Sequence, residues 1–188
     1  MATCISRSPE ETAALGERWG QEAQPGWVIG LSGELGAGKT QLVKGLARGL
    51  GFPGRVHSPT FALVNTYAAG RLPLVHLDLY RLETAEQIAA AGLEEFLRDG
   101  SGVTVIEWAE RWFGRAGSPE PGLLGVQPFV AGARKGCTSE FRVPRRARKI
   151  AEAAHDPTRL ELPARWRSVQ IEPLSETDRR IVYEDLGP

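Results

Sequence analysis

Residues 33–40 read GELGAGKT, and this stretch decides the fold that we expect for the chain. It matches the pattern GxxxxGK followed by Ser or Thr, in which glycines let several backbone amides point at one bound phosphate. An apolar run, GWVIGLS at residues 26–32, precedes it. Leucines at helical spacing follow it, at Leu42, Leu46 and Leu50. A strand, a phosphate loop and a helix are therefore predicted in that order, which is the context that this motif requires.

The chemistry that this loop offers is the binding of a nucleoside triphosphate. The start of the following helix adds a partial positive charge that favours phosphate. Lys39 is expected to reach the β- and γ-phosphates, and the hydroxyl of Thr40 is expected to be a ligand of Mg²⁺. We therefore expect ATP and Mg²⁺ as cofactors, bound between Gly33 and Thr40.

Two acids end apolar strands elsewhere in the chain and are candidates for catalysis. Asp78 follows LVHL, and Glu107 follows VTVI. Open α/β sheets bind ligands at the carboxyl ends of their strands, so both carboxylates are expected beside the phosphate loop. Each acid could hold Mg²⁺ directly, hold it through water, or polarise the attacking water. The sequence does not divide these roles between them.

A polar segment between these elements, HSPTF at residues 57–61, is stiffened by proline and leads into a strand. P-loop enzymes often carry a γ-phosphate sensor at this place, and Thr60 is our candidate for it. His57 and His76 are expected to be structural or surface side chains.

The composition is that of one ordinary globular domain. The chain has 188 residues, 41% of them hydrophobic and 24% charged, and 23 basic residues balance 23 acidic ones. Any binding of nucleic acid or lipid must then come from a local patch. Cys4 and Cys137 lack metal-site spacing and suit a reducing compartment. The N-terminus lacks the features of a signal peptide, and no apolar run approaches the ~20 residues that span a bilayer. We expect a cytoplasmic protein that does not contact a membrane.

The remaining periodic segments predict an α/β fold of the P-loop NTPase type. The expected sheet is mostly parallel with helices on both faces, an antiparallel hairpin within it and a second antiparallel hairpin at the C-terminus. Helices are expected from Ser8 to about Trp19 and from Thr84 to near Gly92. Beyond residues 26–32, strands are expected at residues 61–67, 72–78, 103–107, 165–171 and 180–183.

One segment, from residue 114 to about residue 160, differs in composition from the rest. It begins with glycine and proline and carries a basic run between Arg142 and Lys149. We expect a single domain over residues 1–188 with an insertion at about 114–160, which includes a helix from Pro144 to about Ala154. The insertion is either a solvated surface segment or a patch that faces tRNA or a partner protein.

Four motifs in order, GELGAGKT, HSPTFALVNTY, HLDLYRL and VIEWAER, resemble those of the TsaE family. The resemblance covers residues 8–113, and the closing strands are also similar. It implies an ATPase of bacterial tRNA threonylcarbamoyladenosine synthesis, slow alone and stimulated by its partners. The implied partners are TsaD and TsaB, with tRNA, modified on the adenosine next to the anticodon, reached through the complex. The long segment after residue 113 departs from the family, which passes quickly to its final strands.

The resemblance also implies roles for individual positions. Thr40 and Glu107 would hold Mg²⁺, and Asp78, in the Walker B place, is a third candidate for the metal. Trp108 would lie beside the nucleotide, and Thr12 would contact its base or ribose. The residues that would surround ATP are Leu35, Gly36, Ala37, Gly38, Lys39 and Thr40.

Two further segments follow from the same resemblance. Ser58 and Thr60 would belong to a switch-like segment, and Tyr80 and Arg81 to the DLYR segment. Tyr80 and Trp108 are also large aromatics of a kind that fills cores, and Arg81 is equally able to pair with a surface acid.

Three other functions remain compatible with a phosphate loop. A small-molecule kinase would use the same loop, metal and acid, and would need an acceptor pocket. A GTPase is disfavoured because the chain has no Asn-Lys-x-Asp stretch. A scaffold that binds ATP without turnover would differ from an enzyme in tolerating the loss of Glu107.

Overall fold

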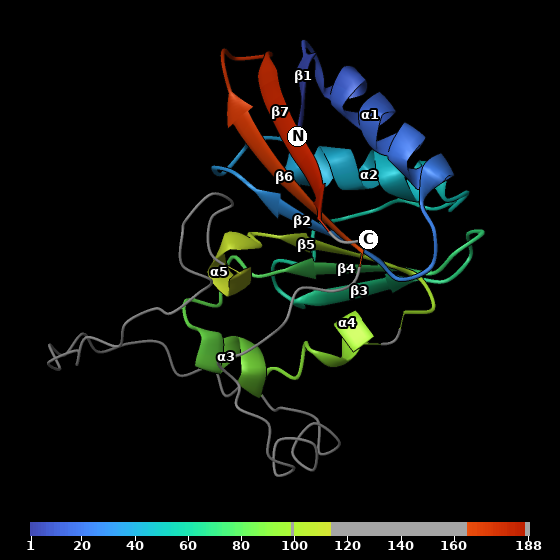
Figure 1. Cartoon of the computed structure of the whole chain (residues 1–188), viewed down its shortest axis with the longest axis vertical. Coiled ribbons are helices and arrows are strands. Elements are labelled where there is room, and N and C mark those ends of the chain that lie inside the picture. The colour runs from blue at the N-terminus through green and yellow to red at the C-terminus, as the bar shows by residue number, and fades with distance from the viewer. Residues whose placement is uncertain (99, 114–164, 187–188) are drawn as a thin grey trace, which may run out of the picture.

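A computed structural model describes residues 1–98, 100–113 and 165–186 of the chain (Figure 1). The expected insertion at 114–160, its helix and Cys137 lie outside the described residues. The strands are β1 (Ala2–Ser6), β2 (Trp27–Ser32), β3 (Val64–Tyr67), β4 (Leu74–Asp78), β5 (Val103–Glu107), β6 (Trp166–Pro173) and β7 (Arg179–Leu186). The helices are α1 (Pro9–Glu22), α2 (Lys39–Gly49), α3 (Ala85–Ala90), α4 (Glu95–Arg98) and α5 (Glu110–Phe113). No helix among the described residues is long and apolar enough to cross a membrane.

The strands of the described residues form one seven-stranded sheet in the order β1-β7-β6-β2-β5-β4-β3. β2 pairs in parallel with β5 and β6, and β4 pairs in parallel with β5. The pairs β1–β7, β6–β7 and β3–β4 are antiparallel. The sheet is therefore mixed rather than mostly parallel. Short connections join β3 to β4 and β6 to β7, and only antiparallel strands can be joined by such connections.

Two elements differ from the sequence-based expectations. β1 was not expected, because ATCIS is short and mostly exposed, and it is held by pairing with β7 at the edge of the sheet. The strand expected at residues 61–67 begins only at Val64. The preceding residues form a turn in which the amide of Leu63 donates to the carbonyl of Pro59 at 2.6 Å and Leu63 has a φ of 65°. Phe61 lies in this turn and is 83% exposed.

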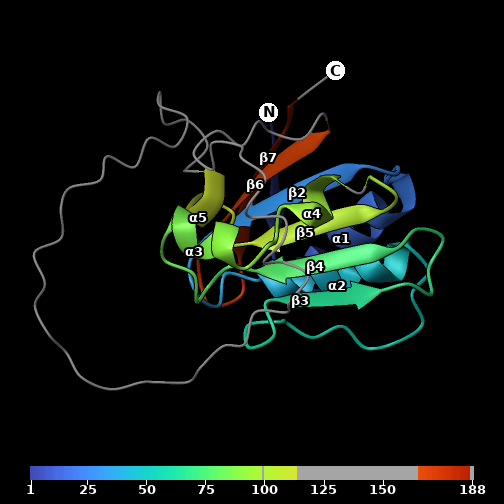
Figure 2. The ribbon, with the colours of Figure 1, turned by 90° about the horizontal axis from the view of Figure 1, so that it is seen from below.

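Helices cover both faces of the sheet, as expected (Figure 2). α1 and α2 pack together on one face, over a core that includes Trp19, Leu42 and Leu46. α3, α4 and α5 lie on the other face, over a second core that includes Leu77 and Ile106. The backbones of α1 and α2 touch, since a Cβ on Gly45 would lie 1.9 Å from the carbonyl oxygen of Ala13. This contact sets the helix of the phosphate loop directly on α1.

The helix starts agree with their sequence signals. Ser8 caps α1, because its side chain accepts a hydrogen bond from the amide of Glu11 at 3.2 Å and Pro9 occupies the first turn. The α3 helix begins with a full capping box between Thr84 and Gln87.

A buried arginine of β6 packs among aromatic rings on the face of the sheet that α1 covers. The guanidinium of Arg167 lies 4.8 Å from the ring of Trp19, 4.7 Å from Trp27 and 5.2 Å from Tyr183. Its Nε and Nη2 both donate to the carboxylate of Asp185, the second at 2.7 Å. This hydrogen bonding holds the pKa of Asp185 below its usual value.

Replacing Asp185 by asparagine is expected to lower stability at neutral pH by about 1 kcal/mol, a value kept small because the Asp185 side chain is 60% exposed. A carboxyl whose pKa is lowered on folding stabilises the native state above its unfolded pKa, and this contribution is lost as the pH falls through the folded value. The difference from the parent protein should therefore shrink as the pH falls below about 3.8 and vanish only below the lowered pKa that Asp185 has in the folded protein. Urea unfolding at pH 7 and pH 3, with Glu172→Gln as a surface control, measures this. A pH-independent difference would contradict the charge-based account.

Candidate functional site

The expected phosphate loop lies between β2 and α2, at the carboxyl edge of the parallel strands. In the sheet register, Leu31 is opposite Glu107, and Glu107 is opposite Asp78, so the two acids end neighbouring strands beside the loop. Gly38 begins α2 with a φ of 105°, a left-handed conformation that a side chain would strain. The tertiary structure thus gathers the loop, Asp78 and Glu107 at one place.

Lys39 is buried, with 4% of its surface exposed. Its ammonium donates to the carbonyls of Gly33 at 2.7 Å and Glu34 at 2.9 Å, and it lies 3.8 Å from the centre of the Trp108 ring. Burial lowers the pKa of Lys39, and attraction by Glu107, Glu110 and Asp78 opposes this effect. The ammonium is therefore held at the loop in a buried environment, where water screens its attraction for an added phosphate only weakly.

Trp108 has an unusual backbone for a bulky residue. It follows β5 directly and has a φ of 62°, a left-handed conformation that costs energy for a side chain of this size. Its ring packs on the Lys39 ammonium and lies 5.2 Å from the ring of Tyr80. The Arg111 guanidinium lies 5.5 Å from the same indole. The strained turn therefore aims the indole at the loop lysine.

Glu107 connects the loop to a buried histidine. Its Oε1 accepts a hydrogen bond from the Thr40 hydroxyl at 2.8 Å and lies 2.9 Å from Nε2 of His76. Glu107 is 3% exposed and His76 is fully buried. Because a carboxylate only accepts, Nε2 of His76 carries the proton and donates.

His76 is a site residue that the sequence analysis did not assign. It was expected to be structural or on the surface; it is buried, which agrees with the structural alternative, and its contact with Glu107 was not foreseen. One signal was present: His76 and Asp78 are two positions apart on β4 and therefore point to the same face of the sheet. What the sequence lacked was the register that places Glu107 beside this face.

Asp78 has a separate set of partners. Its Oδ2 accepts from the hydroxyls of Ser58 at 2.6 Å and Thr60 at 2.5 Å, and its Oδ1 accepts from the amide of Tyr80 at 2.9 Å. These are short hydrogen bonds to an ionised carboxylate, which are stronger than those between neutral groups. Asp78 thus fixes the segment at residues 57–60, whereas Glu107 contacts the phosphate loop.

The other predicted positions differ in their placement. Leu35 is 75% exposed at the tip of the loop, whereas Ala37 is buried. Thr12 is buried, and its hydroxyl lies 2.7 Å from that of Ser6. A Cβ on Gly38 would lie 3.9 Å from the Thr12 methyl group, so Thr12 borders the loop but its hydroxyl is already engaged. Arg81 lies over the ring of Phe61 at 4.3 Å.

The oxygen atoms near the loop include few metal ligands. Among the described residues, no group of three or more His, Cys, Asp and Glu side chains is arranged to hold a metal ion. Hydroxyl and carboxylate oxygens, as in Thr40 and Glu107, are the hard donors that Mg²⁺ prefers, and Mg²⁺ is commonly completed by water and phosphate oxygens. The donor set therefore fits a metal that arrives with a nucleotide.

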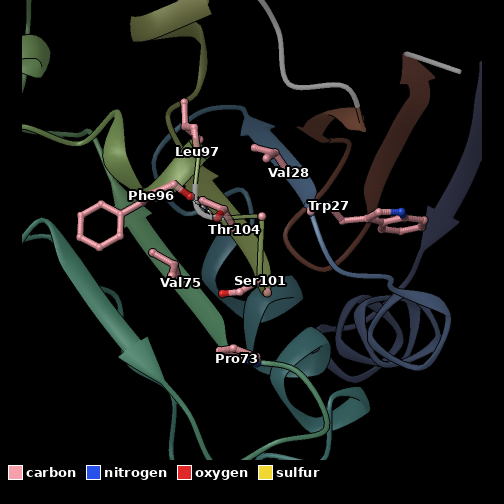
Figure 3. Close-up of a pocket in the computed structure, with 11 residues that line it drawn as sticks. Trp27, Val28, Pro73, Val75, Phe96, Leu97, Ser101 and Thr104 are labelled. Carbon is pink, nitrogen blue, oxygen red and sulfur yellow. Dashed lines mark hydrogen bonds between the residues drawn. The ribbon is translucent and has the colours of Figure 1, made fainter.

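A hollow lies at the opposite, amino-terminal edge of the same strands (Figure 3). Apolar side chains such as Trp27, Pro73 and Phe96 line it, and none of its lining residues is charged. Phosphate chemistry needs charged groups or aligned amides, so this hollow is not the candidate site.

Comparison with known proteins identifies the family of this chain. The sequence profile of the family "Threonylcarbamoyl adenosine biosynthesis protein TsaE" matches residues 6–123, which include the loop, Asp78 and Glu107. The chain belongs to the TsaE family. The family resemblance carried by the four sequence motifs is thereby confirmed, and family membership places the chain in threonylcarbamoyl adenosine biosynthesis.

Individual TsaE proteins and a solved structure give the extent of the similarity. The chain is 48% identical over 108 residues to the tRNA threonylcarbamoyladenosine biosynthesis protein TsaE of Treponema pallidum, a match that covers 57% of this chain and 78% of that one. It is 46% identical over 102 residues to the Bacillus subtilis protein of the same name, covering 54% of this chain and 63% of the relative. The crystal structure of Bacillus subtilis YdiB matches with a TM-score of 0.60 and 26% identity, over 99% of this chain and 86% of that one.

Proposed function

We propose that this TsaE-family chain binds Mg-ATP at residues 33–40 and hydrolyses it to support the threonylcarbamoyladenosine modification of tRNA. One observation carries the proposal: Lys39, Thr40 and Glu107 meet at the start of α2, with the Thr40 hydroxyl 2.8 Å from the Glu107 carboxylate. This is the arrangement of cation, hydroxyl and acid that Mg-nucleotide chemistry uses. Asp78 and Thr60 lie on the adjoining strand and loop.

Binding would begin with the loop itself. Its amides and the start of α2 favour phosphate oxygens over water. Lys39 would exchange its bonds to the carbonyls of Gly33 and Glu34 for bonds to phosphate oxygens. Trp108, already over the ammonium, would keep that part of the site dry and so strengthen its electrostatics.

Thr40 and Glu107 would hold the metal ion, which when bound polarises phosphate oxygens and neutralises charge that develops on them. His76 would keep the Glu107 carboxylate turned toward Thr40. Asp78 is less suited to direct coordination because both of its oxygens already accept hydrogen bonds from the protein. Its proposed role is to anchor the segment that carries Thr60.

Thr60 would act as the sensor of the γ-phosphate. Its hydroxyl donates to Asp78 and lies 2.6 Å from the Ser58 hydroxyl. A hydroxyl can rotate its proton between neighbouring acceptors, so a γ-phosphate oxygen could compete with Asp78 for it. The presence of a γ-phosphate would then change the restraint on residues 57–60.

The proposed partners are TsaD and TsaB, with tRNA engaged through the complex. Large hydrophobic side chains are exposed close to the nucleotide site, namely Leu35 at 75%, Phe61 at 83% and Tyr80 at 40%. These residues come from the phosphate loop and from the segments that Asp78 organises. Exposed apolar side chains grouped in this way favour a protein partner that docks at this edge.

Replacing Phe61 by alanine is expected to reduce partner-stimulated ATP hydrolysis about tenfold without changing ATP affinity, since an exposed aromatic anchor contributes to docking rather than to phosphate contact. Ile5→Ala is a matched control, because Ile5 is 41% exposed and lies on β1, at the edge of the sheet opposite to β3. Phosphate release measured over a titration with TsaD and TsaB separates the two. Equal stimulation of both variants would remove Phe61 from the interface.

The test of the function as a whole is ATP hydrolysis with and without TsaD and TsaB, for the parent protein and for Lys39→Ala. Stimulation of the parent protein alone is expected. Stimulation by a small metabolite instead of the two proteins would favour a kinase. Absence of any partner effect would contradict the proposal.

A further inference from the structure

The turn between β6 and β7, at residues 174–178, is tied to the phosphate loop by one side chain. Arg179 donates from Nε to the carbonyl of Ala37 at 3.1 Å. Its Nη1 donates to the turn carbonyls of Ser175 at 3.0 Å, Glu176 at 3.2 Å and Asp178 at 3.0 Å. A single guanidinium therefore organises the turn and holds it against the loop. Arg179 lies outside the range matched by the family profile.

The bond to Ala37 has a consequence for the amide that follows it. A trans peptide unit is planar, and its C=O and N–H point in opposite directions. Because Arg179 binds the carbonyl of Ala37, the N–H of Gly38 is turned away from Arg179. Backbone amides are the groups that a phosphate loop offers to its ligand. Arg179 thus orients a phosphate-binding amide without needing to touch the phosphate.

The order of the strands indicates which part of a bound nucleotide the β6–β7 turn would face. β5 and β4, which carry Glu107 and Asp78, lie on one side of β2, and β6 lies on the other. If the γ-phosphate and metal face the acids, the nucleoside must leave the loop toward β6. The loop is in direct contact with that side, since a Cβ on Gly33 would lie 2.3 Å from the carbonyl oxygen of Ile171.

We propose that the β6–β7 turn forms the wall facing the nucleoside half of the bound nucleotide, and that Arg179 positions both this wall and the phosphate loop. The inference rests on the proposed binding of Mg-ATP. Leu174 in this turn is 49% exposed, which suits an apolar contact with the face of a base. Thr12 borders the loop through its methyl group.

Two ligands distinguish an effect on the phosphate loop from an effect on the nucleoside contact. They are Mg-ATP, and inorganic tripolyphosphate with Mg²⁺, which has the phosphates but no nucleoside. Binding of both is measured by calorimetry. Arg179→Gln is expected to weaken both ligands about tenfold, because it releases the Ala37 peptide that both would use. Leu174→Ser is expected to weaken ATP about threefold to tenfold and to leave tripolyphosphate unchanged, because only ATP carries a base.

Neighbouring residues provide controls. Arg180→Gln removes an adjacent arginine whose guanidinium pairs with Glu172 on the surface at 2.7 Å, and it should change neither affinity. Leu186→Ser removes a 37% exposed leucine at the far end of β7 and should also be silent. Arg179→Lys keeps the charge but has one donor group in place of the planar fork, so it should recover less than half of the lost binding free energy.

Each result decides the matter. If Arg179→Gln binds both ligands as the parent protein does, Arg179 has no positioning role. Equal weakening of both ligands by Leu174→Ser would place Leu174 at the phosphates, and no effect on ATP would remove the turn from the nucleoside side. If Arg179→Gln is unfolded at the temperature of the assay, the same comparisons are made with Arg179→Lys and Leu174→Ser. Failure of the parent protein to bind Mg-ATP would overturn the proposed function and this inference together, whereas intact binding with silent variants overturns this inference alone.

Discussion

Lys39→Ala is expected to abolish ATP binding, with a loss of affinity of about 100-fold or more. The ammonium is the buried cation of the phosphate loop, and it already donates to two carbonyls whose places phosphate oxygens would take. Alanine would remove both the charge and the donors. The loss should appear for ATP and ADP alike, because the charge acts on phosphates and not on the base.

Lys44→Ala is the matched control for this experiment. Lys44 lies on the same helix, is exposed, and its ammonium is 3.5 Å from the side-chain oxygen of Gln41. Calorimetric titration with Mg-ATP should show no change for this variant. Thermal unfolding of Lys39→Ala should be recorded as well, because Lys39 also restrains the loop through its bonds to the carbonyls of Gly33 and Glu34. Unchanged ATP affinity in folded Lys39→Ala would contradict the assignment of the site.

Glu107→Ala is expected to lower ATP hydrolysis by about 1000-fold while ATP binding weakens much less. The carboxylate is the acid that contacts Thr40, and His76 holds it in place. A metal ion held by Thr40 without the acid would be less well fixed during the reaction. The affinity for ATP should fall less in Glu107→Gln than in Glu107→Ala, because the amide oxygen of glutamine can still accept a hydrogen bond from Thr40.

The same variant separates an enzyme from a scaffold that binds ATP without turnover. In cells that lack their own TsaE, Glu107→Ala should fail to restore the threonylcarbamoyladenosine modification if hydrolysis is required. Glu94→Gln is a control, because Glu94 forms a helix-surface pair with Arg98 at 3.3 Å. Full restoration by Glu107→Ala would favour the scaffold.

Much of the fold followed from local patterns. The residues at 26–32, the loop and α2 are continuous in the sequence, so their order needed no knowledge of distant contacts. The capping serine before α1 and the capping box at Thr84 acted within one turn of helix. The strand β1 was missed because its short, exposed sequence carries no pattern of its own and depends on pairing with β7.

The candidate site likewise has a part that local sequence patterns predict and a part that depends on the assembled sheet. Lys39 and Thr40 could be named as candidates because the roles expected of them follow from backbone geometry within eight consecutive residues. Asp78 and Glu107 were both named, but local patterns describe them alike, each as an acid at the end of an apolar strand. Their different partners depend on which loop each strand end faces, and that is a property of the assembled sheet.

The sequence by itself determined the phosphate loop, the helices that its neighbours form and the family to which the chain belongs, because each depends on short-range backbone and side-chain preferences. The tertiary structure alone decided that His76 supports Glu107, that Asp78 fixes the segment of Thr60, and that Arg179, the first residue of β7, reaches the carbonyl of Ala37 over a separation of 142 positions. These contacts join segments separated by 18 to 142 positions, and no local preference encodes the sheet order that brings them together. The same sheet order distinguishes the side of the loop that faces the acids from the side that faces the β6–β7 turn.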